Sequence, residues 1–463
     1  KKTGELKGVQ AVLNLSELLK VEVDQMHGIE IEEWPARIAE VAMWLIDHQM
    51  NQKVGEAFGQ PVLRLPLVKS AKIEVANALR IDWNDVLRAG RCSYVLGNPP
   101  FVGKKEQNPE QKADMARVWG DVKGAGILDY VTCWYRVAAK YMHGNVVTAA
   151  FVSTNSICQG EQVGVLWSEI LGRRGMFIRF AHNTFSWMSE ARGKAHVHVV
   201  IIGFGPIDGP GTIIDYSDDQ MQPTTSRVGR ISPYLVEGTS LTLSNRSRPL
   251  CDVPEMNYGS MMIDKDRKLP TSKGLILSPA ERAAILAECP AAEPYIRRLY
   301  GADEFINDTE RWCLWLVDAP PSLVRSSRLI AQHLDDVRRF RESSDRAQTK
   351  ELAKTPGLFG EIRQPSTPYL LVPKVSSESR HYLPIGFLEP TAIASGSAVV
   401  VPDATPFHFG VLTSEMHMAW LRAVCGRMKS DYQYSAGLVY NNFPWPQDVS
   451  TRQRSVVEAC AEE

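Results

Sequence analysis

The chain has 463 residues, enough for two or three domains with sizeable hydrophobic cores. Hydrophobic residues make up 44% of it and charged residues 23%, as in ordinary soluble proteins, and no run of about 18 apolar residues indicates a membrane span. The net charge of −1 shows no chain-wide preference for nucleic acid, so any affinity for DNA must come from local patches.

The eight cysteines are scattered along the chain and form no Cys-x-x-Cys pair. We therefore expect neither a disulfide framework nor a metal site. The first residues do not form a signal peptide, and a reducing cytoplasm is the default location.

The first predicted strand runs from His27 to Ile31 and places the acidic Glu30 near its carboxyl end. A carboxylate there suits a ribose, the role that an acid plays in dinucleotide-binding folds. Ile31 is then a candidate to pack on an adenine face. Alternatively, Glu30 only caps the next helix, where a negative charge is favourable in any case.

A helix is expected after this strand, because apolar residues recur at intervals of three and four and Pro35 lies near the first turn. We expect its apolar stripe to be core: Ile31, Trp34, Ile38, Val41 and Leu45. Residues 72–79 are predicted to form the next strand.

The most informative stretch is 93–103, a short apolar strand that runs into Asn98-Pro99-Pro100-Phe101. The two prolines fix φ and remove two backbone donors, so the turn is stiff. It presents the Asn98 amide and the Pro99 carbonyl at the carboxyl end of the strand, the edge where ligands bind in open α/β sheets.

These residue types suit methyl transfer to an exocyclic amine such as adenine N6. Two acceptors, the Asn98 side-chain oxygen and the Pro99 carbonyl, can hold both amine hydrogens while Phe101 stacks on the ring. A base inside a duplex must be flipped out to reach such a site. The alternative is an ordinary exit from a strand into a loop, since Asn-Pro is common in turns.

The segment 103–126 is polar and carries Lys104, Lys105, Lys112 and Lys123. We expect a loop, either one that closes on a flipped base or grips phosphates, or a plain solvated one. A helix at 128–142 follows, and Asp129-Tyr130 at its start is expected to border the cofactor pocket. Further strands are predicted at 146–152, 177–181 and 197–204, the last two as an antiparallel pair. This alternation predicts a doubly wound, Rossmann-like α/β sheet.

A Pro-, Gly- and Ser-rich stretch from 205 to 247 marks a domain boundary. We divide the chain into an α/β domain at 1–210 and a mixed α+β domain at 211–463. Residues 322–382 hold 11 Lys/Arg against seven Asp/Glu, the local excess that phosphate contact requires. Arg338 and Arg363 are candidates there, although a basic run such as Arg338, Arg339 and Arg341 can also be a solvated helix face.

A polar loop follows the predicted strand 369–373 and contains Lys374, Glu378 and Arg380. Lys and Arg suit guanine O6 and N7, and Glu accepts from cytosine N4 in the major groove. We therefore expect these three residues to read bases.

The Asn98–Phe101 motif resembles the catalytic motif of S-adenosylmethionine (SAM)-dependent amino-methyltransferases. Together with residues 28–37, 153–157, 191–195 and 440–446, the stretch from Leu13 to Pro446 resembles the methyltransferase and target-recognition parts of the MmeI-like, type IIL restriction-modification enzymes. The resemblance implies SAM as cofactor, with contacts from Glu30, Ile31, Asn77, Ala78 and Asn98, and catalysis by Asn98, Pro99, Pro100 and Phe101. At the position of Asn77, which contacts the SAM adenine, the family often has Asp.

One family element is missing before Glu30, namely the Gly-rich turn that approaches the methionine part of SAM. The strand with that turn lies mid-sheet in the family, so we expect that this chain does not close its sheet unaided. The resemblance implies further domains of the same protein upstream of Lys1, including a nuclease domain that would need Mg²⁺.

The sequence thus predicts a sequence-specific methyltransferase for adenine N6 in double-stranded DNA, within a cytoplasmic restriction-modification or phage-defence protein. Three alternatives stay open. They are an RNA or protein-glutamine methyltransferase, a non-catalytic DNA-recognition module, and transfer to cytosine N4.

Overall fold

The computed structural model describes residues 20–59, 70–187, 197–216, 222–264, 273–428 and 430–462. The chain divides into two compact units. Unit 1 comprises residues 1–154, 166–186 and 199–240, and unit 2 comprises 155–165, 187–198 and 241–463. Each unit is described by itself.

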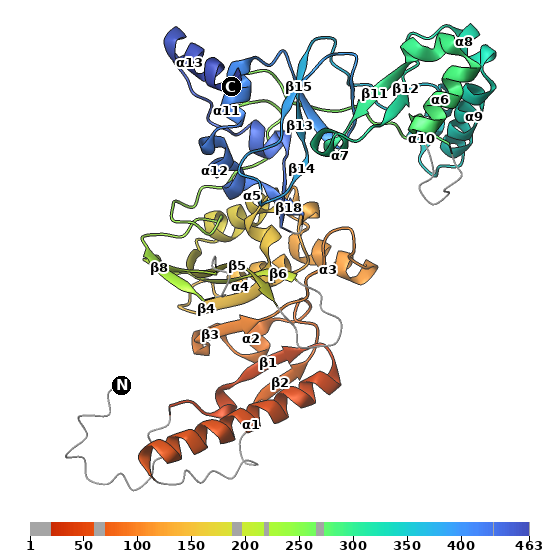
Figure 1. Cartoon of the computed structure of the whole chain (residues 1–463). Helices are drawn as coiled ribbons and strands as arrows, with labels where there is room; N and C mark the ends of the chain where they lie inside the picture. Colours follow the sequence, from red (N-terminus) through yellow and green to blue (C-terminus); the bar gives the residue numbers. More distant parts are fainter. Residues whose placement is uncertain are drawn as a thin grey trace. The chain divides into compact units, whose positions relative to one another are not determined.

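Unit 1 begins with a small parallel sheet. Strand β1 (His27–Glu30) pairs in parallel with β2 (Lys72–Val75), and Glu30 lies opposite Val75. The 26-residue helix α1 (Glu33–Phe58) connects the two strands and runs alongside them (Figure 1). This is a β–α–β unit with both strands ending at the same edge.

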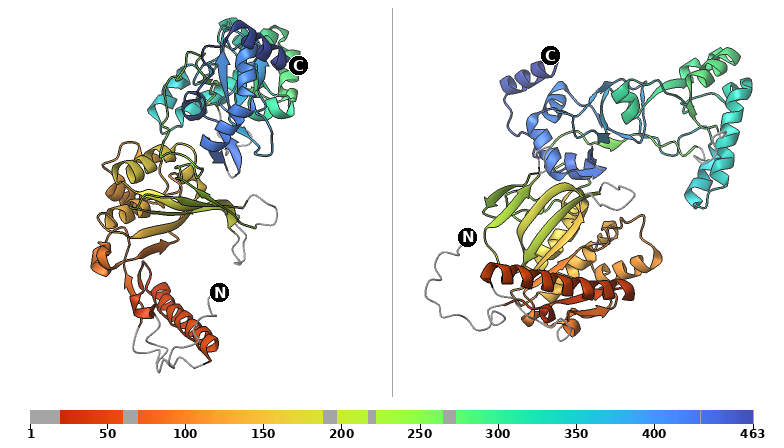
Figure 2. Two further views of the ribbon diagram at one scale, coloured as in Figure 1. Left: turned by 90° about the vertical axis from the view of Figure 1, so that its left-hand side faces the viewer. Right: turned by 60° about the horizontal axis from the view of Figure 1, so that its bottom comes forward.

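The second sheet of unit 1 has six strands in the order β3-β4-β6-β5-β7-β8, seen side by side in Figure 2. Strands β3 and β4 are parallel, β4 and β6 are antiparallel, and β7 and β8 form an antiparallel pair. Strands β7 and β8 carry the sheet past residue 210, and the unit ends at Ser240. The strands are β3 (Tyr94–Gly97), β4 (Thr148–Thr154), β5 (Phe177–Trp187), β6 (Val197–Gly205), β7 (Gly211–Asp215) and β8 (Thr224–Val228).

Among the described residues, β3 is an edge strand, and no strand joins it to β1 and β2. The described residues thus leave the sheet open at β3. One face of this edge strand is apolar and exposed, because Tyr94 is 73% and Leu96 77% exposed. A buried parallel strand would have neighbours on both sides.

The expectation that the stripe on α1 is core is wrong for the described part of the chain. Ile31, Trp34, Ile38, Val41 and Leu45 are all at least half exposed, and Trp34 is 75% exposed. The periodicity correctly marks one apolar helix face. The described residues leave that face uncovered, so it is an open surface here.

The segment 103–126 is also more ordered than expected. Helix α3 (Pro109–Trp119) lies within it and begins with a capping box between Asn108 and Gln111 and with proline in the first turn. Such a start favours a helix even in a polar sequence. Helices α2 (Trp83–Val86) and α4 (Thr132–Tyr141) also belong to unit 1, and α5 (Gln162–Trp167) begins in unit 2 and ends in unit 1.

Unit 2 has two neighbouring lobes (Figures 1 and 2). One packs helices against strands β10, β12, β11 and β16 around a core that includes Leu299, Leu314 and Ile330. Its elements are β10 (Ile276–Leu277), α6 (Pro279–Glu288), β11 (Ile296–Tyr300), α7 (Ala302–Asn307), β12 (Trp312–Leu314), α8 (Pro321–Ser326), α9 (Arg328–Glu342), α10 (Ala347–Glu351) and β16 (Ile393–Ala394).

The other lobe is built on the sheet β15-β13-β17-β9 and on a small sheet β14-β19-β18. Its central strand β13 is fully buried, as the apolar run at 369–373 predicts. Its elements are β9 (Asn257–Tyr258), β13 (Tyr369–Pro373), β14 (Val375–Ser376), β15 (Gly386–Leu388), β17 (Ala398–Pro402), α11 (Pro406–Leu412), α12 (Glu415–Val424), β18 (Gly426–Met428), β19 (Asp431–Gln433) and α13 (Thr451–Glu462). None of the helices in the described ranges has the length and apolarity that a membrane crossing requires.

Candidate functional site

The Asn98–Phe101 turn leaves the carboxyl end of β3, as the sequence predicts. Asn98 is exposed, Pro99 is buried and Phe101 is half-buried. Within the described part of the chain, the Asn98 amide has no hydrogen-bonding partner, so it is available to a ligand. Gly97 lies directly before it against Phe151 of β4, where a Cβ would come within 3.2 Å of two ring carbons.

The chain after the turn is held by the start of the segment 127–132. The Tyr130 backbone N–H donates to the Val102 carbonyl over 3.0 Å, and the Gln107 amide donates to Leu128 O over 3.2 Å. The Asp129 carboxylate accepts from Thr154 Oγ1 at the end of β4, over 2.9 Å. The residues that follow the turn are thus fixed, through the segment 127–132, to the carboxyl end of β4.

The predicted cofactor residues lie at the end of the other sheet. Glu30 ends β1, Asn77 and Ala78 follow β2, and the Ala76 N–H donates to Glu30 O over 2.8 Å. One Glu30 carboxylate oxygen accepts from the backbone N–H groups of Ile31 and Glu32, at 2.9 and 3.3 Å. Glu30 therefore closes the turn between β1 and α1 without capping the helix itself, whose N-cap residue is Glu32, while Oε2 makes no hydrogen bond within the described residues.

A buried carboxylate adjoins Asn77. The side chain of Asp114, on α3, is only 3% exposed and accepts hydrogen bonds from Arg80, Tyr130 and Asn77. Burial by itself would raise the pKa of Asp114, but these three donors outweigh it and hold the pKa below its usual value. Burial, together with Asp114, raises the pKa of the Tyr130 hydroxyl.

These residues fit the adenosine half of SAM. A carboxylate at the end of β1, an exposed Ile31 and an amide after β2 lie at one edge of a parallel pair, where nucleotides bind in α/β folds. The methionine half needs glycines, and between residues 20 and 30 the only glycine is Gly28, inside β1. No cluster of three potential metal ligands occurs among the described side chains.

In unit 2, two predicted DNA-contacting residues meet at an aromatic ring. Lys374 Nζ lies 4.8 Å and Arg363 Cζ 5.9 Å from the centroid of Tyr258, on the edge strand β9. Tyr258 is 43% exposed, and Lys374 Nζ also lies 3.5 Å from Gly396 O. The three side chains form a basic and aromatic surface, which we call the Tyr258 cluster, and the Arg363 guanidinium there is also paired with the Glu361 carboxylate.

Glu378 and Arg380 lie in the loop after β14, and both are exposed. The Glu378 carboxylate lies 3.7 Å from the Arg427 guanidinium, and its carbonyl accepts from Tyr432 Oη over 3.4 Å. The backbone N–H of Arg380 closes a turn on Ser377 O over 3.3 Å. Its guanidinium has no partner in the described chain.

Arg338 lies in the other lobe, on α9, and Figure 1 shows that helix well apart from β14. Its guanidinium pairs with Asp335 over 3.2 Å. The structure therefore brings Lys374 and Arg363 together, places Glu378 and Arg380 on one loop, and leaves Arg338 on a separate surface.

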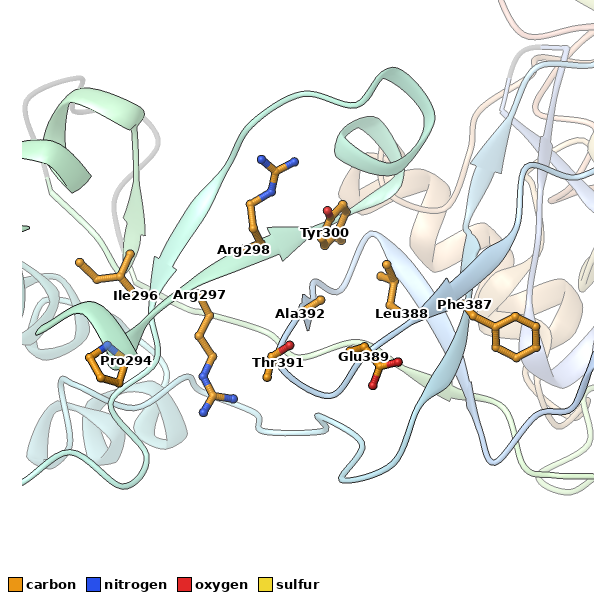
Figure 3. Close-up of a pocket in the computed structure, with 10 residues that line it drawn as sticks. All are labelled: Pro294, Ile296, Arg297, Arg298, Tyr300, Phe387, Leu388, Glu389, Thr391 and Ala392. Carbon is orange, nitrogen blue, oxygen red and sulfur yellow. The ribbon is translucent and has the colours of Figure 1, made fainter.

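Unit 2 also holds a pocket of about 570 Å³ between β11 and the segment 387–392 (Figure 3). Arg297 and Arg298 point to opposite sides of β11, and Arg298 is engaged by Glu310 and Asp308. None of the residues predicted from the sequence lines this pocket.

Sequence reasoning missed Asp114 and Tyr258. Asp114 is one acidic residue in a polar segment, and Tyr258 is an isolated aromatic after the boundary region. The capping residues Asn108 and Gln111 could have revealed α3, but no local pattern marks which of its side chains turns inward.

Comparison with known proteins supports the resemblance. Residues 4–214 match the model of the MmeI DNA-methyltransferase domain, and residues 237–447 match that of the MmeI target recognition domain. The chain is 38% identical over 460 residues to DNA methyltransferase A of Bacillus subtilis (strain 168), a match that spans 97% of this chain and 51% of that protein.

The chain is also similar to the solved structure of the type IIL restriction-modification enzyme MmeI in complex with DNA. Identity is 45% and the TM-score 0.84, and the match covers 98% of this chain and 60% of that one. The chain thus spans between half and two thirds of the length of these relatives. From the arrangement of an Asn-Pro-Pro-Phe turn, the parallel strand pair β1–β2 and a mixed α+β unit, and from these matches along nearly its whole length, we conclude that the chain belongs to the MmeI-like family of restriction-modification enzymes and comprises its methyltransferase and target recognition domains.

Proposed function

We propose that this chain is the methylating and DNA-reading part of a protein that methylates adenine N6 in double-stranded DNA at a specific sequence. The observation that carries the proposal is the exposed Asn98 amide, without a protein partner in the described chain, in a rigid turn beside Phe101. A buried, satisfied amide would be structural, whereas this one is free for a ligand.

The roles of the residues follow from their chemistry. The Asn98 side-chain oxygen and the Pro99 carbonyl accept the two hydrogens of the target amine and direct its lone pair outward. Pro100 keeps the turn stiff, and Phe101 stacks on the flipped base. Glu30 and Ile31 hold the ribose and adenine of SAM, Asn77 and Ala78 border its adenine, and SAM supplies an electrophilic methyl group when bound.

The Tyr258 cluster and the loop with Glu378 and Arg380 are the proposed DNA-contacting surface of unit 2. Lys374 and Arg363 supply positive charge at an aromatic ring, while Glu378 and Arg380 are exposed and polar enough to reach base edges. Arg338, on its separate helix, is proposed to contact phosphate only.

The open edge of β3 and the apolar face of α1 support a contribution from further residues of the same protein, upstream of Lys1. A strand with a Gly-rich turn would pair with β3 and supply the site for the methionine half of SAM. We also propose that the whole protein is a cytoplasmic restriction-modification protein, with a nuclease domain that uses Mg²⁺.

Methyl transfer from radiolabelled SAM to plasmid DNA by the full-length protein tests the function directly. We expect label in N6-methyladenine, and a loss of at least about 100-fold in Asn98→Ala, the scale for one hydrogen-bonding group that acts in the transition state. Label in N4-methylcytosine instead would identify cytosine, and not adenine, as the target base.

Two other functions are separated by the same assay. Transfer to RNA or to a glutamine peptide, but not to duplex DNA, would identify a different methyltransferase. A folded full-length protein that binds DNA and transfers nothing would be a recognition module, and the methyltransferase proposal would fail.

A further inference from the structure

The side chain of Asn77 is held in one orientation. Its Oδ1 accepts from the Leu79 backbone N–H over 2.9 Å, and its Nδ2 donates to Asp114 Oδ2 over 3.3 Å. Asp114 lies 37 residues further along the chain, on α3. The amide group therefore has a fixed oxygen side and a fixed nitrogen side.

We propose that Asp114 is a positioning residue for the cofactor, which orients the Asn77 amide so that Oδ1 accepts from the adenine amine of SAM. The proposal rests on the role in cofactor binding proposed above for Asn77. Oδ1 has two lone pairs and gives one to Leu79, so one remains for the adenine amine. With the amide reversed, an NH₂ group would face another NH₂ group.

Asp114 is suited to this role because it only accepts hydrogen bonds. Arg80 Nε donates to it over 2.8 Å and Tyr130 Oη over 2.9 Å. The Arg80 guanidinium balances its charge, and the three donors keep its pKa low in spite of burial. An ionised carboxylate cannot donate, so only the NH₂ side of Asn77 can face it.

The arrangement also explains why this chain has an amide at position 77. The two oxygens of a carboxylate are equivalent, so a carboxylate needs no partner to orient it. An amide has one oxygen and one NH₂ group, so it needs such a partner. An aspartate at position 77 would face the Asp114 carboxylate at the distance of a hydrogen bond, and like charges that close oppose ionisation. Exchanging the two residues keeps one amide, one carboxylate and a hydrogen bond between them, at the loss of the oxygen that also accepts from Arg80 and Tyr130.

The experiment measures the KM for SAM and the kcat of DNA methylation by the full-length protein, together with SAM binding by equilibrium dialysis. The variants are Asn77→Ala, Asn77→Asp, Asp114→Asn and the exchange Asn77→Asp/Asp114→Asn. Asp121→Asn is the matched control, because Asp121 pairs with Arg136 in the same unit and is 62% exposed.

We expect Asn77→Asp and Asp114→Asn each to raise the KM for SAM about tenfold, the size of one lost hydrogen bond to a charged group, with a smaller change in kcat. The exchange variant should recover part of this loss, because the hydrogen bond between positions 77 and 114 is restored with donor and acceptor reversed, while the new NH₂ group replaces an oxygen that also accepts from Arg80 and Tyr130. A merely structural carboxylate would give no such rescue in SAM affinity.

A pH series provides a second readout that does not depend on Asp114→Asn being folded. In Asn77→Asp, the new carboxylate and that of Asp114 take up a shared proton more readily as pH falls, which relieves their repulsion. The KM of this variant for SAM should therefore decrease between about pH 8 and about pH 6, relative to the KM of the wild type. A parallel pH dependence in both proteins would overturn the proposal.

The remaining outcomes separate this inference from the function it rests on. If Asn77→Ala leaves SAM binding unchanged, Asn77 does not bind the cofactor and both ideas fall together. If Asn77→Ala weakens SAM binding but Asp114→Asn behaves like Asp121→Asn, or the exchange fails to rescue, only the role of Asp114 is overturned.

Discussion

Lys374 Nζ lies 4.8 Å from the centroid of the Tyr258 ring. Tyr258 is on strand β9, far from Lys374 in the sequence. Arg363 approaches the same ring to 5.9 Å. An aromatic face attracts cations, with about 0.5–2 kcal/mol for each good contact. Tyr258 therefore holds two positive side chains on one exposed patch of unit 2.

Replacing Tyr258 by leucine should weaken binding to duplex DNA by about 3- to 30-fold, because the ring no longer holds Lys374 and Arg363. Fluorescence anisotropy with a duplex that carries the methylated site measures this. Tyr258→Phe is the matched control, since it keeps the ring face and should stay close to the wild type. Equal losses in both variants would show that the hydroxyl, and not the ring face, matters.

Gly97→Ala should impair catalysis by displacing the Asn98 turn. The new Cβ would lie 3.2 Å from Cδ1 and Cε1 of Phe151, which is buried and packed against Tyr135 at 5.2 Å between ring centroids. Overpacking of this kind costs about 1–3 kcal/mol in stability.

In Gly97→Ala we expect kcat to fall by a larger factor than the KM for SAM rises. Both constants are measured in the methylation assay. Gly126→Ala is the control, because no heavy atom lies within 4 Å of its Cβ position. Wild-type kcat in Gly97→Ala would mean that Phe151 moves away without affecting the turn.

Arg380 and Arg338 should differ in what they contribute to DNA binding. Arg380 is exposed and its guanidinium has no partner in the described chain, whereas Arg338 is paired with Asp335. Arg380→Ala should cost about 1–3 kcal/mol at the recognised sequence and relax specificity at one base pair. Sequencing of the methylated sites reports that change.

Arg338→Ala should weaken binding to all sequences alike. It should also reduce, by about 1, the slope of the logarithm of the binding constant against the logarithm of the salt concentration. Binding titrations at several salt concentrations give this slope for both variants. A change in sequence preference with Arg338→Ala, or none with Arg380→Ala, would reverse the two assignments.

His417 should make unit 2 sensitive to acid. It is fully buried on α12, its Nε2 contacts Tyr434 Oη at 3.1 Å, and its Nδ1 has no partner among the described residues. Burial lowers its pKa to about 3. The neutral form is favoured in the folded state, so its contribution to stability is complete above the unfolded pKa of about 6.5 and is lost as pH falls from there toward 3.

Between about pH 7 and about pH 4 the wild type should therefore lose about 3 kcal/mol more in its free energy of unfolding than His417→Gln does. Urea titrations at each pH measure the difference. His143→Gln, at an exposed position, should follow the wild type. Identical pH profiles for wild type and His417→Gln would show that water reaches His417 in the folded state.

The elements that could be predicted are those whose cause lies in neighbouring residues. The strand and stiff turn at 93–101 follow from an apolar run and two prolines, and β13 follows from five successive apolar or proline residues. The second fold unit was likewise expected from the change in composition. By contrast, α3 was expected as a loop, although its capping box was present in the sequence.

Periodicity showed which face of α1 is apolar, but not what covers it. The helix has the expected stripe, and yet Trp34 is 75% exposed in the described chain. A pattern reports a preference for burial, whereas burial itself requires a partner surface.

The sequence by itself determined the stiff Asn98–Phe101 turn, several of the strands and helices, and the resemblance to the family, because these depend on short stretches of adjacent residues. Only the tertiary structure decided that Asp114 faces Asn77, that Lys374 and Arg363 share the Tyr258 ring, and that Arg341 is buried. Arg341 belongs to a basic run that can be solvated, but its guanidinium donates to five backbone carbonyls, of Met262, Ile263, Leu352, Thr355 and Leu358. The physical reason is that such contacts join residues far apart in the chain, and their charge and hydrogen-bonding state depend on burial that no local pattern specifies.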